Sequence, residues 1–175
     1  MQHTLTMSGG NDKNNYRISA DYRDAKGIDL RSEREEYGAR ASVMHTSKGG
    51  LFTFTANVAP RIIYRDNADW GVFKDAIEAN PTTPLMDPEK PARYYNFMGQ
   101  VVGSNPVERQ KLEQSKGDTK LLDWDATVKL NLLPLLAKEG KSNHRLTTQL
   151  MFADHQYSNY NSWFRPSTST IAINN

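Results

Sequence analysis

The chain has 175 residues, a formal net charge of +2 and 37% hydrophobic residues. The near-balance of charge excludes the strong positive field that nucleic-acid binding needs, so no nucleic-acid partner is expected. No stretch approaches the roughly 18 consecutive apolar residues of a membrane-spanning helix, and the absence of cysteine excludes disulfides, thiol catalysis and thiolate metal sites. A β-barrel is not excluded, because only alternate residues of its strands face lipid.

A period-two pattern recurs along the chain, and residues 15–23 show it best. Tyr16, Ile18, Ala20 and Tyr22 lie on one face, and polar or charged side chains alternate with them on the other. This period is typical of a strand with one apolar and one wet face. By the same pattern, strands are predicted over residues 3–8, 15–23, 36–46, 51–65, 121–133 and 144–157.

Short connections alternate with long ones between these strands. Residues 9–14, 47–50 and 134–143 are short connections, the first two rich in turn formers, whereas residues 66–120 form a long excursion. Pro60 is expected to break the ladder of the fourth strand. The pattern predicts an all-β fold: an antiparallel meander of about six strands, part of a large transmembrane β-barrel. Alternation also occurs in soluble sandwiches, so that alternative stays open.

The excursion over residues 66–120 contains two predicted short helices. One spans residues 70–79, with Asp69 as its N-cap. The other begins at Asn105, a cap followed by proline at the first helical position, and Glu108 completes a capping-box-like pattern. The proline-rich chain between the helices is expected to be irregular. Residues 158–175 are polar and aromatic, like the start of another long loop.

Several segments resemble the early barrel of SusC/RagA-type TonB-dependent outer-membrane transporters. The resemblance follows the chain order over nearly all of its length. The residues that carry it are 4–10 (TLTMSGG), 15–19 (NYRIS), Tyr22, Gly27 with Ile28, 79–84 (ANPTTP) and 105–107 (NPV).

The resemblance implies a barrel of about twenty-two strands with an inserted plug, driven by TonB and the proton gradient. It places the protein in the outer membrane of a Gram-negative bacterium, as a multi-pass β-barrel in contact with outer-membrane lipid. A SusD-like surface lipoprotein would be its partner, and glycans or peptides its substrates. Residues 1–175 would then be part of the barrel, with an extracellular loop at about 66–120 and with the plug and the remaining barrel absent. The first residues read as a strand and not as a signal peptide, so a piece of a longer protein is expected.

No residue set predicts catalysis. Asp123 and Asp125 share a strand face, which suggests paired catalytic carboxylates, but polar lining of a barrel interior is the favoured interpretation. The glycine pairs lack the context of a phosphate loop and are interpreted as turns. No metal-ligand spacing relates the histidines, which are His3, His45, His144 and His155. We therefore expect no enzyme activity, no cofactor and no metal.

Aromatic residues in the predicted loops are the candidates for ligand contact. Trp70, Tyr94, Tyr95 and Trp163 could stack on a sugar ring or anchor the lipoprotein lid. Packing of loops against each other, or an interfacial girdle, is the favoured interpretation of these aromatics. They also support a second hypothesis, a soluble carbohydrate-binding β-module.

Overall fold

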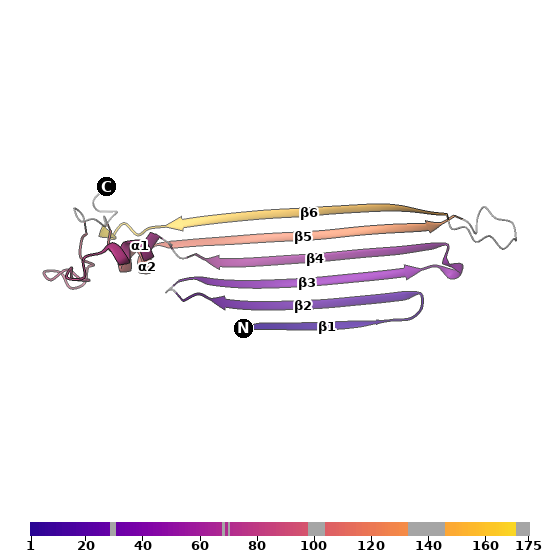
Figure 1. The fold of residues 1–175 in the computed structure, drawn as a ribbon, viewed down its shortest axis with the longest axis horizontal. Helices are drawn as coiled ribbons and strands as arrows, with labels where there is room; N and C mark the ends of the chain where they lie inside the picture. Colours follow the sequence, from indigo (N-terminus) through magenta and orange to yellow (C-terminus); the bar gives the residue numbers. More distant parts are fainter. Residues whose placement is uncertain (29–30, 68, 70, 98–103, 133–145, 171–175) are drawn as a thin grey trace. The chain divides into compact units, whose positions relative to one another are not determined.

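A computed structural model of the chain describes residues 1–28, 31–67, 69, 71–97, 104–132 and 146–170. The fold is all-β: the described strands form one open six-stranded sheet, in the order β1-β2-β3-β4-β5-β6 (Figure 1). The predicted antiparallel meander is therefore confirmed. The strands are β1 (Gln2–Gly10), β2 (Asn14–Lys26), β3 (Glu33–Thr46), β4 (Phe52–Asp66), β5 (Gln114–Asn131) and β6 (Thr147–Phe164).

The register of β1 and β2 aligns their apolar faces. Leu5 lies opposite Ala20, and Met7 lies opposite Ile18. Ring contacts extend this face to later strands: Tyr22 of β2 lies 5.0 Å from Tyr37 of β3, between ring centroids, and His45 of β3 lies 5.8 Å from Phe52 of β4. The predicted strand faces thus continue from β1 to β4, because side chains on a strand alternate with a period of two.

Two short turns join strand pairs at the same end of the meander. Between β1 and β2, the Asn11 side-chain oxygen accepts hydrogen bonds from the backbone N–H groups of Lys13 and Asn14, at 2.9 and 2.8 Å. Between β3 and β4, the one-turn 3-10 helix η1 (Lys48–Gly50) contains Gly49 at φ 79°, a conformation that glycine adopts without steric cost. The third predicted short connection, residues 134–143, lies outside the described residues.

Several strands are longer than predicted, among them β1, β2 and β3. Gly9 and Gly10 belong to β1 and not to the turn, because their pairing with Tyr16 and Asn15 continues the ladder. The Tyr16 ring covers Gly9: a Cβ added there would lie 2.7 Å from the Tyr16 hydroxyl oxygen. β4 stays extended through Pro60 to Asp66, so Pro60 does not end the strand, although it has no N–H to donate to the ladder.

The last two strands are longer than predicted. β5 begins at Gln114 and not at residue 121, and β6 continues to Phe164 instead of ending at residue 157. The β5 extension has no apolar side chain on either face, so an apolar pattern could not reveal it. The β6 extension mixes Tyr160, Trp163 and Phe164 with serine and asparagine, which resembles an aromatic loop. Backbone pairing holds the first extension, since Asn67 N–H donates to the Ser115 carbonyl at 2.8 Å. The long excursion is correspondingly shorter than residues 66–120.

The two predicted helices are present, as α1 (Gly71–Glu78) and α2 (Pro106–Leu112). The Asp69 carboxylate accepts from Gly71 N–H at 2.9 Å, as an N-terminal cap does. Asn105 is the N-cap of α2, as predicted. None of the helices in the described residues is long and apolar enough to cross a membrane.

The chain divides into two compact units. The sheet unit comprises Met1–Asp24, Glu36–Ile63 and Thr119–Asn159; the loop unit comprises Ala25–Glu35, Tyr64–Asp118 and Tyr160–Asn175. In the described residues of the sheet unit, Ile63 is the one buried large hydrophobic residue. The apolar row of the sheet is therefore exposed or half-buried instead of forming a core.

Candidate functional site

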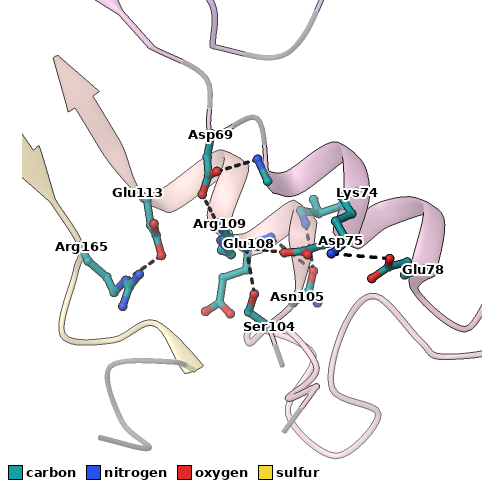
Figure 2. Close-up of polar contacts among 12 residues, drawn as sticks. Asp69, Lys74, Asp75, Glu78, Ser104, Asn105, Glu108, Arg109, Glu113 and Arg165 are labelled. Atoms are coloured by element: carbon teal, nitrogen blue, oxygen red, sulfur yellow. Dashed lines mark hydrogen bonds and ion pairs between the residues drawn. The ribbon is translucent and has the colours of Figure 1, made fainter. Parts of the chain in front are cut away.

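Arg109 connects the two helices of the loop unit. From α2, its guanidinium hydrogen-bonds to the carboxylates of Asp69, which precedes α1, and Asp75, which lies within α1 (Figure 2). The same group lies 3.4 Å from the Ser104 hydroxyl oxygen. The Arg109 side chain is 19% exposed, so these charge-assisted contacts are partly shielded from water and stabilise one arrangement of the helices.

Asn105 joins the proline-rich loop to the start of α2. Its side-chain oxygen accepts from the N–H groups of Val107 and Glu108, at 3.1 and 3.3 Å. Its amide nitrogen donates to the carbonyls of Leu85 and Tyr95, at 3.0 and 3.3 Å. Because Asn105 is fully buried and both polar atoms of its side chain are bonded, it has the full complement that a buried amide needs.

Glu108 does not complete a capping box in the described structure. Its two carboxylate oxygens accept hydrogen bonds from the N–H and the hydroxyl of Thr170, the former at 2.7 Å. The residue is 2% exposed. Glu108 therefore tethers the segment after β6 to α2, and the capping-box interpretation of this residue was wrong.

The loop unit contains a cavity of 410 Å³, lined by one tryptophan and by equal numbers of acidic and basic side chains. Its lining includes Arg31, Asn67, Asp69, Arg109, Gln110, Glu113, Ser115 and Trp163. The Arg165 guanidinium lies over the Trp163 ring, 4.7 Å from its centroid, and its Nε donates to the Glu113 carboxylate at 2.6 Å. Arg31 donates to the Glu113 carbonyl. The indole thus lies beside a network of ion pairs and hydrogen bonds that fixes its surroundings.

The structure places the sequence-predicted aromatics in different environments. Trp163 lines the 410 Å³ cavity but lies in β6 and not in a loop. Tyr94 lines a second cavity, of 500 Å³, and forms an isolated bridge with Met86. Tyr95 is half-buried and packs against Phe97, at 6.2 Å between ring centroids, which fits loop packing. Trp70 lies outside the described residues.

The polar face of the sheet unit carries its own network of paired side chains. Asp125 accepts a hydrogen bond from the Asn57 amide at 2.9 Å, whereas Asp123 hydrogen-bonds to His155. The two carboxylates therefore have separate partners. In the described part of the chain, no group of three or more His, Asp or Glu side chains could hold a metal ion.

Sequence reasoning did not identify the residues that organise the loop unit. The acidic partners of Arg109 lie 34 and 40 positions away, and Glu113 lies 52 positions from Arg165. No local spacing signals such pairs. The cap at Asn105 was predictable because its signal, a proline at the next position, is local.

Comparison with models of known protein families finds no match, and no curated protein matches the chain.

Proposed function

We propose that the chain is a barrel segment of an outer-membrane active importer of the SusC/RagA type. The observation that carries the proposal is the exposed apolar face of a single sheet. Leu5 is 76% exposed, Leu150 59% and Phe152 58%. Each such side chain left in water forgoes about 1.5–3 kcal/mol relative to burial, so this face requires an apolar cover. Lipid is such a cover for the outer face of a barrel.

The opposite face supports the same proposal, because it is suited to water. Glu36, of which the whole residue is 4% exposed, lies 3.6 Å from Arg61 and 3.8 Å from Arg23. Thr119 donates a hydrogen bond to Asn159 at 3.1 Å. Transmembrane barrels have a polar interior of this kind, open to a channel or filled by a plug.

Strand length is a further support. β5 and β6 each have 18 residues, whereas a tilted strand needs about 9–11 residues to cross the bilayer. Strands longer than the hydrocarbon core extend beyond the membrane, as in large barrels with long extracellular loops. In this proposal the chain from β4 to β5, with α1 and α2, is such a loop.

The identity of the importer rests on the resemblance at residues 4–10, 15–19, 79–84 and 105–107. From it we propose energy supply by TonB, a SusD-like lipoprotein as the surface partner, and glycans or peptides as the substrates. The protein would act by transport and not by catalysis. Its location would be the outer membrane of a Gram-negative bacterium.

A soluble carbohydrate-binding β-module is the second candidate, favoured by the cavity beside Trp163. Fractionation of producing cells separates the two. The importer stays in the outer-membrane fraction after an alkaline carbonate wash and shows heat-modifiable mobility in electrophoresis. A module that partitions into the aqueous fraction and unfolds cooperatively without detergent contradicts the importer.

A further inference from the structure

We propose that the cavity beside Trp163 binds a neutral sugar ring, with Trp163 as its stacking surface. The charge of the lining favours a neutral ligand. The charged residues that line the cavity are Arg31, Asp69, Arg109 and Glu113, whose formal charges cancel. A ligand with a net charge gains no Coulomb attraction there, whereas a neutral ligand with many hydroxyls meets both donors and acceptors.

Trp163 is 60% exposed although it lines a cavity whose other side chains are polar. The C–H face of a pyranose is apolar, and an indole offers a large, rigid surface on which such a face stacks. Because the Arg165 guanidinium lies over one face of the Trp163 ring, the sugar would stack on the opposite face. The polar side chains around it, among them Asn67 and Gln110, could then bind the hydroxyls at the rim of the ring.

The side chains around the cavity are pre-organised. Arg165 lies over the indole and is held by Glu113, whose side chain is 9% exposed. Arg109 is held by Asp69 and Asp75. Because these side chains are already paired, little rotamer freedom remains to be lost when a ligand binds. A peptide would be served less well, since the lining offers no apolar pocket for a side chain.

As a statement about the imported substrate, the inference rests on the proposed function and selects glycan over peptide. As a statement about binding it stands alone. Cell fractionation tests the importer, and binding to the purified protein tests the site, so the two fail separately.

The test uses the full-length protein that contains residues 1–175, purified in detergent, with calorimetry against neutral hexasaccharides of glucose, mannose, galactose and xylose, and against uncharged hexapeptides. At least one hexasaccharide should bind. Trp163→Ala should weaken that binding by about tenfold or more, equivalent to about 1.4 kcal/mol. Trp163→Phe should retain part of the affinity, because a smaller aromatic face remains.

Two further readouts separate a local effect from misfolding. Tyr160→Ala removes an aromatic side chain of β6 that is 67% exposed and does not line the cavity, and it should leave the affinity unchanged. In the parent protein, tryptophan fluorescence should change when the saccharide binds. In Trp163→Phe that change should disappear while calorimetry still detects the saccharide. Three outcomes would overturn the proposal: no hexasaccharide binds, Trp163→Ala binds with unchanged affinity, or a peptide binds in a way that depends on Trp163.

Discussion

Asp21 and Arg61 form an ion pair across an intervening strand. Asp21 lies on β2 and Arg61 on β4, with 3.8 Å between the carboxylate oxygen and the guanidinium nitrogen, while β3 runs between them. Strands two apart are about 9–10 Å from each other, so a side chain between them would obstruct this contact. The position between them is Gly38, where an added Cβ would lie 2.6 Å from both Asp21 oxygens.

Gly38→Leu should therefore separate Asp21 from Arg61. A double-mutant cycle with Asp21→Ala and Arg61→Ala measures the coupling free energy, which we expect to be about 0.2–1 kcal/mol because both side chains are partly exposed. In the Gly38→Leu background the coupling should fall to zero. Ser42→Leu is the matched control, since it adds the same side chain to the same face of β3. Undiminished coupling in Gly38→Leu would show that the glycine does not permit the pair.

The contrast between Tyr16 and Gln114 shows what sequence alone could predict. The segment around Tyr16 alternates apolar and polar side chains, and its strand was predictable because one face needs an apolar environment. Gln114 begins a strand extension that is polar on both faces, so only backbone pairing with a distant segment reveals it. Trp163 was selected as an aromatic, but its place in β6 depends on the same kind of long-range pairing.

Removal of Arg109 should loosen the loop unit. Arg109→Met leaves the carboxylates of Asp69 and Asp75 without their shared cation, and we expect a loss of about 1–3 kcal/mol in the free energy of unfolding of this unit. Limited proteolysis should then cleave between β4 and β5 faster than in the parent protein. Arg109→Lys should restore only part of the protection, because an ammonium lacks the fork that reaches two partners. Lys111→Met, at an exposed position of α2, is the control. Equally fast cleavage of the Lys111→Met variant would mean that the loss of a positive charge, and not the loss of the Arg109 contacts with Asp69 and Asp75, loosens the unit.

Asn105 allows the two sides of one amide to be tested separately. Asn105→Asp keeps the oxygen that caps α2 but loses the donor to the Leu85 and Tyr95 carbonyls, whereas Asn105→Ala loses both. We expect Asn105→Ala to cost about 1–3 kcal/mol, from the cap and from buried carbonyls left without a donor. Hydrogen exchange should show that Asn105→Asp exposes the proline-rich loop while α2 stays protected. Loss of α2 protection in Asn105→Asp, equal to that in Asn105→Ala, would contradict this division.

Val128 and Thr127 test which face of the sheet meets lipid. Both are half-buried neighbours on β5, and they point to opposite faces because strand side chains alternate. Thr127 shares the face of Asp125, whose carboxylate pairs with Asn57, so Val128 belongs to the apolar face.

If that face contacts lipid, Val128→Arg should cost roughly 2–4 kcal/mol near the bilayer midplane, because a cation there leaves water. Thr127→Arg should cost much less, because a wet interior solvates the guanidinium. The folded fraction of each variant of the full-length protein in lipid vesicles measures the difference. Equal losses would remove the support for a lipid-facing side, and a larger loss in Thr127→Arg would reverse the assignment of the two faces.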